Sequence, residues 1–338
     1  MCMFERVKKV LRKTTEQSTN DLICEDNIAV EKLSVRNWRS FTQDHFIRAV
    51  IAKRADFDDF YSMLSDEESR IIFDWIVGYR FLAGIFGELK LWENMPNPSP
   101  LYKMHPGSIS IEEVKKGYDW VINNAESLPE PLDVYGMWHT FYLEHYEIKG
   151  ICQVESGDIV FDIGGYIGDT AVYFGKKVLP SGHVYTFEPN VEWAGFIREN
   201  LKKFQLENVT IVPYCLSDKP ATHFMERADS FSSSEIQGAT KVEAITVDDY
   251  VKENNIEHLD LMKLDIEGAE RFALLGARQT IEQLRPKIAL SIYHGGESGY
   301  GDFYELPELV RDLCRDYSFY LRHKNACLFE TVLFCIPN

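Results

Sequence analysis

The chain has 338 residues, and its 36 lysines and arginines stand against 53 aspartates and glutamates, which gives a formal net charge of −17. This length suits about two domains, and a hydrophobic content of 45 % is too high for a disordered chain. Because nucleic-acid binding needs clustered lysine and arginine side chains, the negative charge argues against a nucleic-acid partner. The composition favours a globular protein that acts on a small molecule.

Seven widely spaced cysteines, without a Cys-x-x-Cys pair, indicate neither a disulfide framework nor a zinc site. Such free thiols are typical of a reducing compartment, so we expect a cytoplasmic protein. No apolar run approaches the roughly 20 residues of a transmembrane helix. Residues 1–13 place basic side chains around an apolar stripe, which predicts an amphipathic helix. This helix either caps the amino-terminal region or makes a weak peripheral contact with an anionic membrane.

Residues 1–134 are expected to be a mainly helical region. Residues 65–68 and 110–113 both have the capping-box pattern, in which a serine and a glutamate bond to free amides at a helix start. The first box precedes an apolar stripe with helical spacing that runs to residue 82. Prolines between residues 96 and 106 separate the two predicted helices.

Residues 135–156 are predicted to connect this region to a carboxyl-terminal domain, and the first half of the connector is rich in aromatic residues. Aromatic rings at this density form either the core of a domain junction or a wall of a ligand cleft, because rings also stack on flat ligand groups. The sequence leaves both interpretations open.

From residue 157 to residue 338, short apolar runs alternate with helical segments, which predicts a parallel sheet covered on both faces. The last two runs lie too close together for a helical crossover, so we expect an antiparallel hairpin at the sheet edge. The predicted fold is therefore a doubly wound α/β domain with a seven-stranded, mostly parallel sheet. The strands are expected at residues 158–164, 183–189, 209–214, 260–266, 287–293, 319–323 and 330–336, and the helices at residues 168–179, 190–204, 247–254, 267–276 and 305–315.

A glycine-rich turn follows the first predicted strand, at the sheet edge where such folds bind ligands. Its glycines, at positions 164, 165 and 168, let the backbone approach a ligand closely. The dinucleotide fingerprint needs a glycine where this chain has Tyr166. Asp162 would repel a pyrophosphate but can accept hydrogen bonds from a ligand ammonium or hydroxyl group. The alternative is an ordinary turn between a strand and a helix.

Glu188 follows the second predicted strand, where a carboxylate can accept hydrogen bonds from both hydroxyl groups of a ribose. On its own this residue could equally cap the next helix. Together with the glycine turn it predicts a site for a nucleoside with a cationic tail, which describes S-adenosylmethionine better than NAD.

Residues 157–336 resemble the FkbM family of S-adenosylmethionine-dependent methyltransferases. The segments that carry the resemblance are FDIGGYIGDT (161–170), YTFEPN (185–190), ITVDDY (245–250), LMKLDIEGAE (261–270), LSIYH (290–294) and LRHKNACLFETVLF (321–334). The resemblance implies a Rossmann-like class I methyltransferase fold over residues 157–338, with S-adenosylmethionine above the first two strands. It implies cofactor contacts from the glycine turn and helix start, from the second strand and from the adenine end of the site: Asp162, Gly164, Gly165, Tyr166, Gly168, Asp169, Thr170, Glu188 and Ser217.

Charged residues gather after the fourth predicted strand. Strand alternation places Lys263, Asp265 and Glu267 on one side of an extended segment, so the two acids are expected to face a methyl acceptor. Lys263 needs a buried carboxylate partner, and Asp265 is the nearest in sequence. The alternative is a purely structural cluster of ion pairs.

His294 ends the fifth predicted strand and opens a glycine-rich loop. With an ordinary pKa of about 6.5, it could accept a proton from an acceptor hydroxyl group. Arg322 and His323 could orient the substrate, or equally pair with Glu330.

The sequence therefore predicts methyl transfer from S-adenosylmethionine to a hydroxyl group of a sugar-like or polyketide-like acceptor. His294 or Asp265 is the expected base, and Glu267 and Lys263 are expected to set its orientation or charge. Two alternatives are a nicotinamide-dependent oxidoreductase and a non-catalytic nucleoside-binding scaffold. Asp265, Glu267 and His294 could hold a divalent ion, but their spacing matches no strict template, so no metal is predicted.

Overall fold

The computed structural model describes residue 50 and residues 52–86, 111–227, 230–232, 240–294, 301–324 and 330–338. The predicted amphipathic helix at residues 1–13, the proline-rich linker at 96–106 and most of the glycine-rich loop after His294 lie outside the described residues. Among the helices that are described, none combines the length and the apolar character that a membrane span requires.

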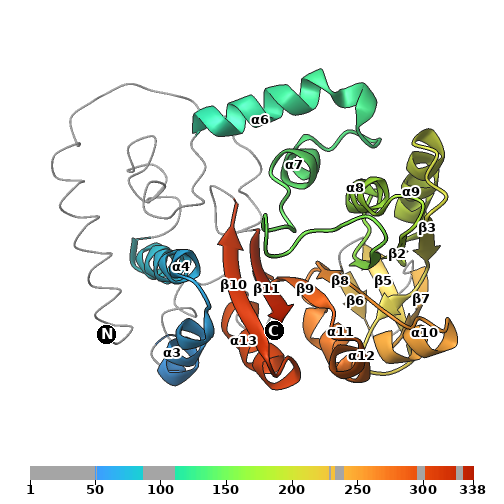
Figure 1. The fold of residues 1–338 in the computed structure, drawn as a ribbon. Coiled ribbons are helices and arrows are strands. Elements are labelled where there is room, and N and C mark those ends of the chain that lie inside the picture. Colours follow the sequence, from blue (N-terminus) through green and yellow to red (C-terminus); the bar gives the residue numbers. More distant parts are fainter. Residues whose placement is uncertain are drawn as a thin grey trace.

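A seven-stranded sheet forms the centre of the molecule (Figure 1). Every neighbouring pair from β9 to β3 is parallel, whereas β11 is antiparallel to both β9 and β10. All seven predicted strands and the terminal hairpin are confirmed. In sheet order the strands are β10 (Tyr317–His323), β11 (Thr331–Pro337), β9 (Lys287–Ser291), β8 (Leu261–Leu264), β1 (Ile159–Ile163), β2 (His183–Phe187) and β3 (Val209–Val212).

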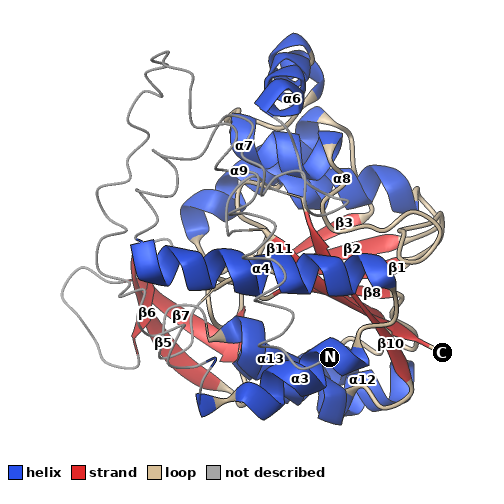
Figure 2. Cartoon of the chain, turned by 90° about the vertical axis from the view of Figure 1, so that its left-hand side faces the viewer, coloured by secondary structure: helices blue, strands red, loops and turns tan. Residues whose placement is uncertain are grey.

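Helices cover both faces of this sheet (Figure 2). On one face, α8 (Asp169–Val178) and α9 (Val191–Lys203) pack over β1, β2 and β3. The residues that fill the opposite face include Phe161 and Leu264 from the strands and Ile281 and Val310 from the helices. The helices of that face are α10 (Val247–Glu253), α11 (Glu270–Leu275), α12 (Arg278–Leu284) and α13 (Asp302–Leu313), of which α12 was not predicted.

A second, four-stranded sheet also escaped prediction. Its strands are short and its order is β4-β7-β5-β6. Because β4 follows β3 directly, this sheet places residues 215–217 beside the carboxyl end of β2. Its strands are β4 (Cys215–Leu216), β5 (Ala221–Arg227), β6 (Ser230–Ser232) and β7 (Thr240–Ile245).

The described amino-terminal helices α3 (Arg54–Met63) and α4 (Glu67–Phe86) share the hydrophobic core of the central sheet. The rings of Phe57, Phe73 and Phe303 meet there with centroid distances of 5.7–6.4 Å. Leu64 forms a parallel bridge with Phe319 of β10. This bridge covers the exposed edge of the sheet, which would otherwise present unpaired backbone groups.

The helix cap at α4 differs from the predicted one by one residue. Asp66, not Ser65, accepts the Ser69 N–H at 2.8 Å, and the Ser65 hydroxyl accepts the Phe319 N–H at 2.9 Å. The capping-box pattern located the helix correctly, but Ser65 is occupied by the sheet edge.

Arg322 of β10 also bonds to this cap and not to Glu330. Its guanidinium group lies 2.6 Å from Asp66 and 3.3 Å from Glu68. Its neighbour His323 is fully buried and bonds to Thr331 at 2.9 Å. The proposed pairing with Glu330 is therefore wrong. Arg322 and His323 instead bond to groups at the sheet edge.

The connector and α6 (Ile111–Asn123) lie above α8 and α9 (Figure 1). Short helical turns, η3 (Ala125–Ser127), α7 (Val134–Met137) and η4 (Trp138–Tyr142), follow α6. Trp138 is buried against α6, where a Cβ on Gly117 would lie 2.2 Å from the indole nitrogen. The same cluster includes Ile167 of the glycine turn, so the connector is packed onto the ligand-binding edge of the sheet.

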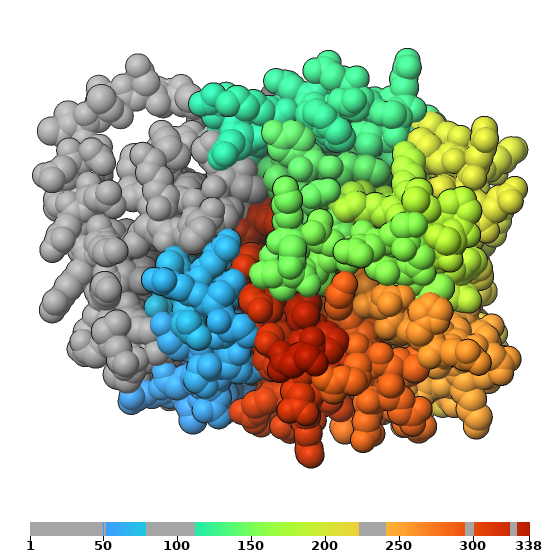
Figure 3. All heavy atoms as spheres, viewed as in Figure 1, coloured from blue at the N-terminus to red at the C-terminus, as the bar shows by residue number. Residues whose placement is uncertain are grey.

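Contacts with the carboxyl-terminal hairpin fix the connector from the other side (Figure 3). The Lys324 ammonium group donates to the carbonyl oxygens of Leu143, Glu144 and Glu147 at 2.7–3.0 Å. The residue after β10 therefore holds the connector in place over the sheet.

Candidate functional site

A cavity of about 750 Å³ opens at the carboxyl ends of β1, β2 and β8. Its walls come from the glycine turn, from the residues after β2 and β4, from the loop between β8 and α11, and from the connector. A volume of this order suits a cofactor-sized ligand. The cavity lies at the edge where the sequence predicted the site.

The glycine turn brings the backbone to the cavity at close range. Gly164 has φ +93°, and a Cβ there would lie 1.9 Å from the carbonyl oxygen of Asp265. A Cβ on Gly165 would lie 2.3 Å from the Thr186 hydroxyl oxygen. Gly168, at φ +92°, forms the cap of α8. Gly164 lines the cavity, whereas Gly165 and Gly168 pack against the protein.

Asp162 does not face the cavity, which corrects the expectation that it contacts a ligand. Its carboxylate is fully buried and accepts hydrogen bonds from the Thr170 and Thr186 hydroxyl groups, each at 2.9 Å. Its third partner is the Lys263 ammonium group at 3.2 Å. Asp162 therefore holds the turn from inside the protein.

Lys263 pairs with Asp162 and not with its sequence neighbour Asp265. β8 lies beside β1 with Lys263 opposite Asp162, so the register of the two strands makes the pair. The ammonium group also donates to the Gly164 carbonyl oxygen. Lys263 is 2 % exposed, and its position connects the glycine turn to β8.

Glu188 faces the cavity from the end of β2 and is 4 % exposed. Its two carboxylate oxygens accept the Asn190 N–H at 2.8 Å and the Tyr166 N–H at 2.9 Å. Burial raises the pKa of Glu188 to about 7, although these two hydrogen bonds oppose the shift. The group is therefore held in a fixed orientation, and its charge changes near neutral pH.

Asp169, Thr170 and Ser217 also line the cavity. Burial raises the pKa of Asp169 to about 6, against a hydrogen bond from the Thr140 hydroxyl group. The Thr170 hydroxyl is occupied by Asp162. The Ser217 hydroxyl donates to Asp218 at 3.2 Å. Asp169 is the only one of the three with a carboxylate, and a bound cation would favour its ionised form.

Tyr166 stands at the rim of the cavity in a left-handed conformation, with φ +44°. Its ring packs edge-on against Trp193 of α9 at a centroid distance of 4.7 Å. Trp193 lines the cavity as well, and it was not predicted as a site residue.

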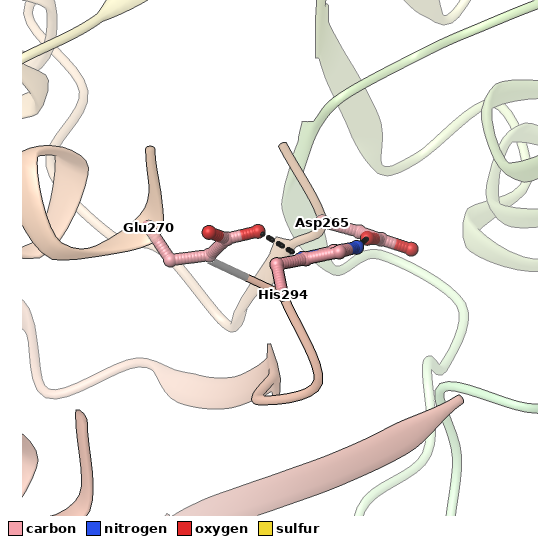
Figure 4. A group of neighbouring side chains, drawn as sticks. All are labelled: Asp265, Glu270 and His294. Carbon is pink, nitrogen blue, oxygen red and sulfur yellow. Dashed lines mark hydrogen bonds and ion pairs between the residues drawn. The ribbon is translucent and has the colours of Figure 1, made fainter. Parts of the chain in front are cut away.

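On the opposite wall, Asp265, Glu267, Glu270 and His294 form a group that we call the acid–histidine cluster. Figure 4 draws three of them, Asp265, Glu270 and His294. The Nδ1 atom of His294 lies 2.8 Å from Glu270, and its Nε2 atom lies 3.4 Å from Asp265 and 3.7 Å from Glu267. Asp265 and Glu267 line the cavity, but they do not continue an extended segment as predicted, because β8 ends at Leu264 and Glu267 has a left-handed backbone with φ +55°.

The cluster makes His294 unsuited to act as a base. Burial lowers the pKa of His294, but the charges of Glu270, Asp265 and Glu267 outweigh burial and raise it to about 10. An imidazole with this pKa already carries a proton at neutral pH and cannot accept another. This corrects the expectation of an unperturbed histidine and leaves Asp265 as the predicted base.

Two tyrosine hydroxyl groups surround Asp265. Tyr146 donates to its Oδ2 atom, and Tyr293 lies 3.3 Å from its Oδ1 atom. Burial and the neighbouring charge of Asp265 raise the pKa of Tyr146 well above its usual range, so its hydroxyl group stays protonated. Sequence analysis did not select either tyrosine, although Tyr146 belongs to the aromatic stripe of the connector.

The connector forms the wall between these two ends of the cavity. Tyr135, His139 and Tyr146 line it, whereas Trp138 is in the core, so both interpretations of the stripe hold for different residues. Glu330, between β10 and β11, also lines the cavity and lies 3.2 Å from both the Tyr135 hydroxyl and the His145 Nε2 atom. Glu330 lies in a segment that carries the family resemblance, but it was not selected as a site residue because its position depends on the hairpin.

Comparison with known proteins identifies a protein family for the sheet domain. Residues 162–319 match the family described as "Methyltransferase FkbM domain". The chain is 24 % identical over 153 residues to the 2-O-methyltransferase NoeI of Sinorhizobium fredii, a match that covers 38 % of this chain and 60 % of that protein.

A solved structure shares the fold. The crystal structure of the methyltransferase FkbM from Methylobacillus flagellatus superposes with a TM-score of 0.59 at 16 % identity, over 89 % of this chain and 65 % of the other. The chain thus spans less than two thirds of the length of either protein. The superposition supports the Rossmann-like class I methyltransferase architecture that the strand order indicates.

We expect Gly164→Ala to lower the free energy of unfolding. The left-handed backbone alone costs about 1–3 kcal/mol for a residue with a side chain, and the new Cβ would also collide with Asp265. Gly195→Ala is the matched control, because its Cβ would enter open space on α9 and alanine favours a helix by about 1 kcal/mol. Urea unfolding followed by circular dichroism measures both. Equal stabilities of the two variants would contradict the close approach at Gly164.

Proposed function

Since residues 162–319 belong to the methyltransferase FkbM family, we propose that this chain transfers a methyl group from S-adenosylmethionine to a hydroxyl oxygen of a small-molecule or saccharide acceptor. The observation that carries the proposal is the cavity over β1 and β2, with a glycine turn on one side and the oriented carboxylate of Glu188 on the other. The acceptor is proposed to be sugar-like or polyketide-like, and the name of the 2-O-methyltransferase NoeI supports an oxygen acceptor.

The residues around the cavity fit the charge and shape of this cosubstrate. Gly164 lines the cavity with its backbone, and Glu188 would accept hydrogen bonds from the ribose hydroxyl groups. Asp169 would face the cationic methionine part, and Ser217 lies where the adenine would end. Among the described residues that line the cavity, Lys263 is the only lysine or arginine, and it is already paired with Asp162. A pyrophosphate would therefore meet these carboxylates without a free lysine or arginine to balance its charge. This arrangement disfavours NAD.

The proposed chemistry asks little of the protein beyond orientation and proton removal. S-adenosylmethionine supplies a methyl group that its sulfonium already makes electrophilic. The chain would hold the acceptor oxygen in line with that group, against Asp265 and Glu267 at the acid–histidine cluster. Asp265 would take the hydroxyl proton, and the protonated His294 and the hydroxyl groups of Tyr146 and Tyr293 would hold its carboxylate in place.

Ligand binding and its pH dependence test the proposed cosubstrate. S-adenosylhomocysteine should bind in calorimetric titrations, and NAD should not. Because the ionised Glu188 is the form that accepts ribose hydroxyl groups, affinity should fall as pH drops below its pKa of about 7. Glu188→Gln should weaken binding at pH 8 by roughly tenfold and flatten the pH dependence, since a hydrogen bond to a charged group contributes about 1.5–3 kcal/mol. Binding of NAD without S-adenosylhomocysteine would overturn the proposed function.

The second prediction concerns Asp265. Asp265→Asn should lower methyl transfer by roughly 10²–10⁴-fold, the usual contribution of a general base, and leave the affinity for S-adenosylhomocysteine within a few fold. The assay is transfer of labelled methyl from S-adenosylmethionine to a panel of mono- and oligosaccharides. Asp312→Asn, an exposed position on α13, is the matched control and should behave like the wild type. Wild-type turnover by Asp265→Asn would refute the assignment.

A further inference from the structure

The acid–histidine cluster gathers more negative charge than its own histidine can balance. Asp265, Glu267 and Glu270 surround one imidazole, and the nearby Lys263 is paired with Asp162. His294 is 8 % exposed, and its Nε2 atom makes no hydrogen bond to any described residue. At neutral pH this nitrogen carries the proton that partly balances the nearby carboxylates, and a divalent ion bound in its place would displace that proton.

The distances from the His294 Nε2 atom to the two cavity-lining carboxylates are longer than ordinary hydrogen bonds and suit ligands of a shared ion. The Nε2 atom lies 3.4 Å from the Oδ1 atom of Asp265 and 3.7 Å from the Oε2 atom of Glu267. Two ligand atoms, each about 2.1 Å from one ion, are about 3.4 Å apart at a tetrahedral angle and about 3.0 Å apart at an octahedral one, so small side-chain movements would bring these atoms to an ion. Glu267 has a side chain that is 62 % exposed, so its carboxylate can adjust to an ion.

Glu270 has the role of an outer partner. Its Oε1 atom accepts from the Ile266 N–H and bonds with Nδ1 of His294, each at 2.8 Å, and its Oε2 atom accepts the Gly268 N–H at 2.9 Å. With its oxygens occupied, it fixes the imidazole ring and directs Nε2 away from itself. Metal-binding histidines commonly have such a carboxylate on the second ring nitrogen.

The geometry points to a divalent metal site in which His294 Nε2, Asp265 and Glu267 bind the ion and Glu270 positions the histidine. Figure 4 shows Asp265, Glu270 and His294 of this group. One imidazole and two carboxylates suit a first-row transition ion such as Mn²⁺. Asp265 and Glu267 line the cavity, so the ion has an open side toward it. Its role rests on the proposed function: an acceptor hydroxyl group beside the ion would be more acidic and would pass its proton to Asp265 more easily.

Calorimetric titration of the EDTA-treated, dialysed full chain with MnCl₂ tests the site. Mn²⁺ is the probe because it prefers oxygen and imidazole ligands to the free cysteines. We expect one ion per chain, with binding weakened at least tenfold by Asp265→Asn and several-fold by Glu267→Gln. Glu270→Gln should weaken it by roughly 10–100-fold through the histidine. Glu308→Gln, an exposed position on α13, is the control for the lost charge and should bind as the wild type does.

Two results would overturn the site: the absence of saturable Mn²⁺ binding up to millimolar concentration, or equal binding by the wild type and both Asp265→Asn and Glu267→Gln. Glu267 is exposed, so its variant should fold, and circular dichroism of each variant checks this. Titration of the same preparations with S-adenosylhomocysteine separates the two proposals. Nucleoside binding without Mn²⁺ binding refutes only the metal site, and the reverse refutes only the cosubstrate.

Discussion

The buried ion pair between Asp162 and Lys263 is the interaction on which the site depends. It joins the carboxyl ends of β1 and β8, and its members also hold Thr170, Thr186 and the carbonyl oxygen of Gly164. Removing one partner of such a pair leaves an unbalanced buried charge, which costs about 3–5 kcal/mol. The pair therefore holds Gly164 so close to Asp265 that a side chain at position 164 would collide with the Asp265 backbone.

This arrangement divides the acidic residues into two groups. Asp162 is neutralised inside the protein. Glu188 and Asp169 face the cavity without an ion-pair partner among the described residues, whereas Asp265 lies beside His294. Burial raises the pKa of Glu188 to about 7 and that of Asp169 to about 6, so a bound cation would favour their ionised forms. The cavity is thus suited to a ligand with hydroxyl groups at one end and a positive charge near its centre.

The central sheet could be predicted from the sequence because apolar runs and helical stretches alternate along most of the domain, whereas the second sheet and α12 were missed. The turn at residues 162–168 and the acid at Glu188 were found for the same reason: each directly follows a strand. Partners set by strand register could not be predicted in this way. Lys263 pairs with Asp162 because the two strands are neighbours, not because of their distance in sequence. The environment of His294 and the positions of Tyr146 and Glu330 likewise depend on segments far apart in the chain.

A crystal structure of the full chain soaked with S-adenosylhomocysteine tests the central claim most directly. The account predicts density for the nucleoside between the glycine turn and Glu188, with ribose hydroxyl oxygens within hydrogen-bond distance of that carboxylate. An empty cavity in crystals of a chain that binds the compound in solution, or a nucleoside bound elsewhere on the molecule, would contradict it.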